Sequence, residues 1–363
     1  MCTSLLYLDA NNLPYVGRTL ELSIELPYLI ARLPRDSKYE SQVEGFPSLQ
    51  WTTRYTILAV TMPMSMPAAG TAPQQSELKV IEGMNEAGLC FSVQSYGPAA
   101  GPQPDLDNSQ AALAAIDLGT YLLGQCGTVV EAKAALEHVQ VALEPLAMLG
   151  GLSTPFHYAL HDALGQSMVI EFHQGVRTIY DNPVGVLTNA PQFSWHLTNL
   201  NNYTFLSNVD HSHAQFMHYH AIQPGAGIAK AGLPTSDTSA DRFIRAVYYA
   251  HFAQKEEDPD KAVQMVAHIM NNFDRPRGIT IDPPDIGSTH LQVAGVSAEQ
   301  VPTEFTSWTS ISDINRRRLY LRGSEGMNYV FLDLQAQLQS RRFVVCPMAK
   351  LLVTPPNVTA QFY

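Results

Sequence analysis

The sequence has few of the residues that build disulfide frameworks, metal centres or membrane spans. Only four of the 363 residues are cysteines, and none belongs to a CxxC pair. Such scattered cysteines argue against a zinc site and against a disulfide framework. No run of about eighteen apolar residues, the length that crosses a bilayer, occurs along the chain, so we expect no membrane span.

Charge is also scarce. Charged residues make up 15% of the chain, the net charge is −11 and the pI is near 5.5. This lightly charged, acidic composition argues against nucleic acid and anionic membranes as partners. A hydrophobic content of 45% supports a packed core, and no repeat or low-complexity tract occurs, so we predict one domain over residues 1–363. No signal-peptide pattern precedes Cys2, which favours the cytoplasm, or the periplasm if a leader has been trimmed.

What the sequence does contain is a thiol at its second position. Removal of Met1 is favoured by the small side chain that follows, and it would give Cys2 both a thiol and a free α-amine. An α-amine titrates near pH 8, so it can act as the base for its own nucleophile. The alternative is an idle or buried cysteine.

A strand–turn–strand pattern over residues 3–22 brings charged partners to this thiol. Folding this hairpin places Cys2 opposite Leu20 and Ser4 opposite Arg18. The guanidinium of Arg18 would then favour a thiolate on Cys2.

Glu21 follows closely, and its carboxylate would hold the protonated α-amine of Cys2. Arg18 and Glu21 point to opposite faces of a straight strand, so we expect a bulge or twist between them. The alternative is a surface ion pair between the two side chains.

The predicted elements alternate between strands and helices along the chain. Expected strands cover residues 3–8, 15–22, 54–61, 88–94, 156–161, 167–172, 176–180, 185–187, 319–321 and 329–334. Expected helices cover residues 109–125, a segment opened by a capping box at 128–131, and residues 239–253 and 259–272. This order suits two stacked sheets with helices on the outside.

Ordered sequence blocks resemble the choloylglycine hydrolase family, which includes conjugated bile salt hydrolases and penicillin V acylases. The similarity is carried by Met1–Ser4, Gly17–Glu21, Glu82–Leu89, Gly185–His196, Gly232–Pro234, Ser239–Arg245 and Phe305–Ser310. The resemblance implies an α+β fold, the four-layer αββα sandwich of N-terminal-nucleophile hydrolases. In that fold two stacked, mainly antiparallel sheets lie between outer helices. The resemblance also implies that no metal or organic cofactor is needed.

The resemblance implies six catalytic residues: Cys2, Arg18, Glu21, Asn85, Asn189 and Arg242. Cys2 matches the family's nucleophile, and Asn85 and Asn189 match asparagines of its oxyanion hole. Two side-chain amides are good donors to the oxygen that becomes negative during attack on an amide. The alternative for each asparagine is a turn or capping role. Glu21 replaces the usual aspartate, which moves the carboxylate by about an ångström.

A methionine-rich segment follows one of the predicted strands. Met62, Met64 and Met66 could line an adaptable apolar pocket for an acyl group, together with Leu20. The alternative for these methionines is gap-filling in the core.

Together these features predict a cysteine N-terminal-nucleophile amidase that cleaves linear C–N amide bonds through an acyl-thioester on Cys2. The resemblance implies small N-acyl amides as substrates, such as penicillin V or glycine- and taurine-conjugated bile salts. Two alternatives remain, an N-acyl homoserine lactone acylase and a non-catalytic ligand-binding relative weakened by Glu21. A papain-like protease is disfavoured, because Cys90 and Cys126 lack the flanking signature of that family.

Four histidines lie within the segment Asp210–His220. By position this segment resembles the projecting loop through which family tetramers contact one another, which implies a homotetramer. The alternatives are a polar loop and a transition-metal site.

Overall fold

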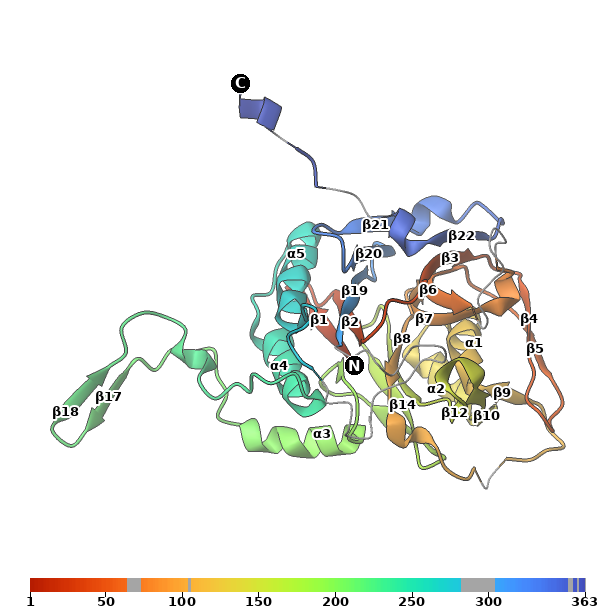
Figure 1. Cartoon of the computed structure of the whole chain (residues 1–363), viewed down its shortest axis with the longest axis horizontal. Helices are drawn as coiled ribbons and strands as arrows, with labels where there is room; N and C mark the ends of the chain where they lie inside the picture. Colours follow the sequence, from red (N-terminus) through yellow and green to blue (C-terminus); the bar gives the residue numbers. More distant parts are fainter. Residues whose placement is uncertain (64–72, 104–105, 282–303, 352–354, 358, 363) are drawn as a thin grey trace.

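Two antiparallel sheets lie between outer helices in the computed structural model (Figure 1). The structure describes residues 1–63, 73–103, 106–281, 304–351, 355–357 and 359–362. Within these residues the layers run from helices through two sheets to helices, so the predicted αββα sandwich is confirmed.

The first sheet carries the N-terminal hairpin. Its six strands are, in spatial order, β16 (Val186–Leu187), β1 (Cys2–Leu8), β2 (Pro14–Leu22), β19 (Phe305–Asp313), β20 (Arg318–Gly323) and β21 (Val330–Asp333). β1 therefore lies between β16 and β2, which come from distant parts of the chain.

The second sheet has eight strands in the described residues. In spatial order they are β15 (Val176–Asp181), β14 (Ser167–His173), β13 (Phe156–His161), β8 (Cys90–Ser95), β7 (Leu78–Asn85), β6 (Ile57–Pro63), β3 (Leu29–Leu33) and β22 (Val344–Pro347). Smaller pairs are formed by β4 (Lys38–Ser41) with β5 (Leu49–Thr52), β9 (Ala112–Ala114) with β10 (Gln140–Ala142), β11 (Pro145–Leu146) with β12 (Leu152–Ser153), and β17 (His213–Phe216) with β18 (Tyr219–Ile222).

Five α-helices occur in the described residues: α1 (Leu118–Gln125), α2 (Val129–Glu137), α3 (Phe193–Leu200), α4 (Ser239–Phe252) and α5 (Pro259–Met270). Three begin at a capping side chain, because Thr128, Thr238 and Asp258 accept hydrogen bonds from backbone N–H groups of the first turn of α2, α4 and α5. α4 and α5 contact β1 and β2, whereas α1 contacts β7 and β8.

Alternation along the hairpin divides its side chains between two cores. Leu5 and Tyr7 pack toward α4 and α5, whereas Cys2 and Leu20 pack between the two sheets. Gly17 lies under α5, where an added Cβ would come within 2.5 Å of Met270 Sδ. A glycine at this position therefore allows α5 to approach the sheet closely.

Most predicted elements are confirmed within one to three residues, but the predicted helix over 109–125 is wrong in its first half. Residues 112–114 form β9 and pair with β10, and α1 begins only at Leu118. The apolar spacing of this segment fits both a helix and a strand, and pairing with a distant strand decides between them. β19 was not among the predicted strands.

Candidate active site

The thiol of Cys2 lies at the start of β1, between the two sheets. Cys2 is opposite Leu20 and Ser4 is opposite Arg18, so the predicted register is confirmed. Cys2 is only 4% exposed, and Arg18 Nη2 lies 3.6 Å from its Sγ.

Arg18 is fixed by contacts on the inner faces of both sheets. Its guanidinium lies 4.7 Å from the ring centroid of Trp308 on β19 and donates to the backbone oxygen of Val93 on β8. Its Nη1 lies 3.5 Å from Glu82 Oε2, and both side chains are fully buried. Arg18 therefore presents a fixed positive charge to the sulfur.

Glu82, which sequence analysis did not select, reaches Arg18 because of a β-bulge in β7. Val60 pairs with Glu82, but the next residue of β6, Thr61, pairs with Val80. The extra residue turns Glu82 to the face between the sheets, while Val80 faces the helices. Burial raises the pKa of Glu82 to about 7, an effect opposed by Arg18 and by the hydrogen bond from Ser92 Oγ.

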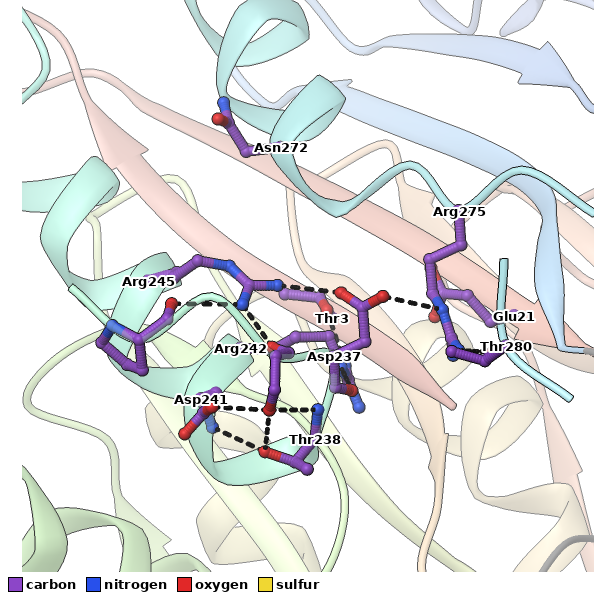
Figure 2. A network of polar contacts seen from close by, with 12 residues as sticks. Thr3, Glu21, Asp237, Thr238, Asp241, Arg242, Arg245, Asn272, Arg275 and Thr280 are labelled. Carbon is purple, nitrogen blue, oxygen red and sulfur yellow. Dashed lines mark hydrogen bonds and ion pairs between the residues drawn. The ribbon is translucent and has the colours of Figure 1, made fainter. Parts of the chain in front are cut away.

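Asn189 and Arg242 hold the backbone of Cys2. The Cys2 nitrogen donates to Asn189 Oδ1 at 2.8 Å, and Arg242 Nη2 donates to the same oxygen at 2.7 Å. Arg242 Nη1 also donates to Cys2 O and, at 2.7 Å, to Thr3 Oγ1; Figure 2 shows Arg242 beside Thr3. Residues from β1, α4 and the segment after β16 thus meet at one point.

The backbone of Asn189 is held in turn by two helices. Its N–H donates to Ser239 Oγ at 2.8 Å, and its carbonyl lies 2.8 Å from His196 Nε2. Burial lowers the pKa of His196 to about 4, so the ring is neutral and Nε2 carries the hydrogen that the carbonyl accepts. One Nδ2 hydrogen of Asn189 goes to Ser95 O at 2.8 Å. Among the described residues the second Nδ2 hydrogen is left for a substrate.

Glu21 lies on the face of β2 opposite Arg18, because the two residues are an odd number of positions apart on the strand. No bulge in β2 is needed; the register shift lies in β19, between Thr306 and Trp308. Burial raises the pKa of Glu21, an effect opposed mainly by Arg242. Met1 extends the pairing, because Glu21 N donates to Met1 O at 2.8 Å and the Met1 amine donates to Glu21 O at 2.6 Å.

A network of charges supports the loop before α4 (Figure 2). Asp237 accepts contacts from Arg245 at 3.2 Å and from Arg275 at 3.3 Å, and its backbone oxygen accepts from Arg242 Nε at 3.0 Å. Arg275 Nη1 also pairs with Glu304 Oε2 at 3.0 Å. The loop before α4 therefore lies beside Arg242 and is held by it through the backbone of Asp237.

Asn85 is a turn residue, and its prediction as an oxyanion donor is wrong. Its two Nδ2 hydrogens go to Leu123 O at 2.8 Å and Cys126 O at 2.7 Å, so neither is left for a substrate. Asn85 lies at the Cys90 end of β8, whereas Asn189 meets Ser95 at the other end, about 16 Å away along the strand. Asn85 therefore has the alternative role given in the sequence analysis, that of a turn residue.

An apolar pocket opens at the thiol. We define this apolar pocket by Cys2, Leu20, Tyr28, Met62, Phe91 and Tyr158. The rest of its lining is mainly apolar but includes Arg18, Glu21, Lys79 and Ser95. Leu20 and Met62, two of the residues predicted to line an acyl pocket, line this apolar pocket together with Cys2, and their role in substrate binding stays a prediction. Met64 and Met66 lie outside the described residues.

A second, more polar pocket adjoins the first. We define this polar pocket by its described lining: Met1, Leu22, Ser23, Ser95, Gly97, Pro98, Asn189, Ala190, Ser239 and Glu304. Met1, Leu22 and Ser95 line both pockets, so the two meet beside Cys2.

A family model described as linear amide C–N hydrolases, choloylglycine hydrolase family, matches residues 2–341. The chain belongs to this family. A bile salt hydrolase/transferase of Lactiplantibacillus plantarum is 29% identical over 77% of this chain and 80% of its own length. A penicillin V acylase of Pectobacterium atrosepticum is 24% identical over 92% of this chain and 81% of its own length.

Solved structures of the family share the fold. A variant of the conjugated bile acid hydrolase from Clostridium perfringens has a TM-score of 0.79 at 22% identity, covering 99% of this chain and all of its own. Penicillin V acylase from Agrobacterium tumefaciens has a TM-score of 0.71 at 21% identity, with coverage of 95% and 91%. The protein is accordingly a hydrolase of linear amides, as predicted.

The histidine-containing segment forms a hairpin, β17–β18, that projects from the body (Figure 1). Among the described residues, this hairpin included, no group of three or more histidine, cysteine, aspartate or glutamate side chains is arranged to hold a metal ion. None of the described helices is long and apolar enough to cross a membrane.

Proposed function

We propose that this hydrolase is a cysteine N-terminal-nucleophile amidase that cleaves small N-acyl amides through an acyl-thioester on Cys2. One observation carries the proposal: the sulfur and the nitrogen of Cys2 are each held by a buried partner, Sγ by Arg18 and the nitrogen by Asn189. A nucleophile and its base must be fixed together for an N-terminal residue to perform both roles.

The reaction begins after Met1 has been removed and the Cys2 nitrogen has become an amine. The amine takes the proton of the thiol, and the thiolate attacks the amide carbon, forming a C–S bond while the carbonyl electrons move to oxygen. The guanidinium of Arg18 favours the thiolate electrostatically. The second Nδ2 hydrogen of Asn189 donates to the developing oxyanion.

The intermediate then collapses and the C–N bond breaks. The departing nitrogen takes the proton held by the Cys2 ammonium, and an acyl-thioester remains on Cys2. The free amine next removes a proton from water, and the hydroxide adds to the thioester carbon. Expulsion of the thiolate and its reprotonation release the acid and restore the enzyme.

The apolar pocket takes the acyl group of the substrate. Its lining removes hydrocarbon surface from water, which is worth roughly 0.8 kcal/mol for each buried CH₂ group. Acyl groups with an aromatic or long aliphatic body therefore bind better than short ones. Discrimination among such groups rests on pocket shape and is worth only about 1–3 kcal/mol.

The test combines an assay with intact-mass determination on purified protein. We expect hydrolysis of phenoxyacetyl or long-chain acyl amides, a mass without Met1, and an added acyl mass on Cys2 with a slowly hydrolysed substrate. The Cys2→Ala variant should fold normally and lose turnover. An active Cys2→Ala protein, or an active wild type that retains Met1, would exclude the proposal.

The same assays separate two alternatives. A non-catalytic ligand-binding relative would bind these amides without turnover, and Glu21→Asp would then be expected to gain activity. An N-acyl homoserine lactone acylase uses the same steps and would show turnover confined to lactone substrates. The burial of Glu21 beside Arg242 favours an active enzyme, because the arginine offsets the carboxylate's charge.

We also propose that β17–β18 contacts a neighbouring subunit in a homotetramer. The hairpin exposes Phe216, Met217 and Tyr219, at 64%, 89% and 69%, and exposed apolar side chains of this size are typical of interaction sites. Sedimentation of wild type should give a tetramer, and Phe216→Asp should give smaller species. A wild type that sediments as a monomer at high concentration would exclude this assembly.

A further inference from the structure

Two buried side chains near Asn189, His157 on β13 and Glu171 on β14, have no part in the reaction proposed above. Their exposed fractions are 0% and 1%. Polar groups in a core are costly unless they are hydrogen-bonded, so the contacts of this pair show what it holds in place.

His157 joins the segment that carries Asn189 to the second sheet. Its Nε2 lies 3.1 Å from the backbone oxygen of Thr188, the residue before Asn189. A carbonyl oxygen only accepts, so Nε2 carries the hydrogen of this contact. Its Nδ1 lies 3.1 Å from Glu171 Oε2. The contact with the carboxylate needs one further proton, on the ring or on the carboxyl group, so the buried pair has no net charge.

The ring of His157 also packs against the strand that meets Asn189 from the other side. Tyr96 stacks on this ring, with centroids 4.7 Å apart and an interplanar angle of 17°. Tyr96 directly follows Ser95, whose backbone oxygen accepts from Asn189 Nδ2 at 2.8 Å. One ring therefore contacts both the residue before Asn189 and the residue after its hydrogen-bond acceptor.

Glu171 connects this pair to α3. Its carboxylate accepts from the backbone N–H of Phe193, the first residue of α3, with distances of 3.1 Å to Oε2 and 3.3 Å to Oε1. His196 of the same helix donates to the carbonyl of Asn189 at 2.8 Å. The two peptide groups that flank the Cα of Asn189 are thus held by two histidine rings. Glu171 supports one of these rings directly and the other through α3.

We propose that His157 is a positioning residue for the amide of Asn189, an inference that rests on the amidase function proposed above. Fixing the peptide groups on both sides of the Asn189 Cα sets the direction of its side chain, and an oxyanion donor works only when it points at the oxygen. This donor acts as charge develops on the substrate. Its misplacement therefore lowers kcat and leaves KM nearly unchanged.

The test compares two substitutions that keep different nitrogens of the ring. In His157→Gln the amide nitrogen can take the place of Nε2, whereas in His157→Asn it takes the place of Nδ1 and does not reach Thr188. We expect His157→Asn to lower kcat by roughly tenfold, the effect of one hydrogen bond lost from a buried carbonyl, with KM within about twofold of wild type. His157→Gln should keep kcat within about threefold of wild type.

His161 provides a matched control on the same strand. It lies four residues further along β13, about 13 Å away, and is also fully buried. Burial lowers the pKa of His161 to about 4, and its ring nitrogens have no hydrogen-bond partner among the described residues. His161→Asn should leave kcat as in wild type. Thermal unfolding of each variant shows that the assays are made on folded protein.

A second measurement asks whether the effect of His157 passes through Asn189. In a protein that already carries Asn189→Ala no side-chain amide is left to position, so adding His157→Asn should lower kcat by less than about twofold. A substitution that only loosens the fold would lower kcat by the same factor in both backgrounds.

A second variant keeps the test open if His157→Asn does not fold. Tyr96→Leu removes the ring that stacks on His157 but leaves both hydrogen bonds of the histidine in place. It should lower kcat by about threefold in the wild-type background and should have no effect in the Asn189→Ala background.

The outcomes separate this inference from the proposed function. Absence of Cys2-dependent turnover in wild type would remove the amidase itself, and a folded Asn189→Ala protein with kcat near that of wild type would remove the role of its amide. An unchanged kcat in folded His157→Asn, or an equal fall in both backgrounds, would overturn only the positioning by His157.

Discussion

Asn85 and Asn189 are both buried asparagines beside strand ends, but their side-chain amides bond to different kinds of partner. Each is buried at or just beyond the end of a strand, accepts N–H groups at Oδ1 and donates from Nδ2. Oδ1 of Asn85 accepts hydrogen bonds from backbone N–H groups of its own turn. Both Nδ2 hydrogens donate to backbone carbonyls near the end of α1. Oδ1 of Asn189 instead accepts hydrogen bonds from the Cys2 nitrogen and from Arg242, which come from distant parts of the chain. An asparagine that satisfies its own turn stabilises the fold, whereas one that joins distant elements can serve the reaction.

The largest expected effect is that of Asn189→Ala on catalysis. Loss of its amide removes the proposed oxyanion donor and the acceptor that holds the Cys2 nitrogen, so kcat should fall by about 100- to 1,000-fold. Steady-state kinetics measure this fall, and thermal unfolding reports whether the fold is retained. A folded Asn189→Ala protein with kcat within threefold of wild type would contradict the proposed role.

Asn85→Ala should show the reverse pattern. Its buried amide makes five hydrogen bonds, and leaving the partners unsatisfied should lower the free energy of unfolding by about 3 kcal/mol. Below the unfolding transition its kcat should stay within about twofold of wild type, since the amide lies about 16 Å along β8 from Ser95. Denaturant unfolding measures the first quantity and kinetics the second. A tenfold fall in kcat for the folded protein would show that Asn85 takes part in catalysis.

The contrast between Asn85 and Asn189 also shows which parts of the site can be predicted from the sequence. The hairpin register followed from the two-residue period of strands and a short turn, so Arg18 was placed opposite Ser4 and beside the thiol. The partners of Asn85 lie near the end of a helix that is distant in sequence, and a local motif does not reveal whether an amide is already satisfied.

The sequence analysis missed two other features, strand β19 and the inward orientation of Glu82, for related reasons. β19 contains many buried serines and threonines, including Ser310 opposite Arg18, so it lacks the alternation of apolar and polar residues that marks a strand. The inward orientation of Glu82 depends on the bulge between β6 and β7, which is set by pairing between strands. A carboxylate between the apolar residues Ile81 and Met84 was the one signal that could have selected it. The single-domain organisation stays a prediction.

Glu82→Gln tests the buried carboxylate behind Arg18 through pH. Because burial raises the pKa of Glu82 to about 7 from an ordinary value of 4.5, the folded protein retains a proton that the unfolded chain has released in this interval. The stabilisation from that proton is complete below the unfolded-state pKa and is lost as the pH rises through about 7. The variant should show a flatter dependence of unfolding free energy on pH, by up to about 1.4 kcal/mol per pH unit.

Denaturant unfolding at several pH values measures this slope. Glu137→Gln, on the exposed side of α2, is the matched control and should leave the slope as in wild type. Other groups that titrate in this interval are common to all three proteins and cancel in the difference. Parallel curves for Glu82→Gln and wild type would show that Glu82 does not retain its proton in the folded state.

The smallest expected effect concerns the hydroxyl that holds the backbone of Asn189. Ser239 Oγ accepts the N–H of Asn189 and lies 2.9 Å from Thr188 Oγ1, so Ser239→Ala removes one support while His196 still holds the carbonyl. A single hydrogen bond contributes about 1 kcal/mol, which corresponds to a roughly fivefold fall in kcat if the amide becomes less well placed. Ser239→Thr keeps the hydroxyl and should restore kcat. A fall in the free energy of unfolding without a change in kcat would show that Ser239 stabilises the segment after β16 but does not position the amide of Asn189.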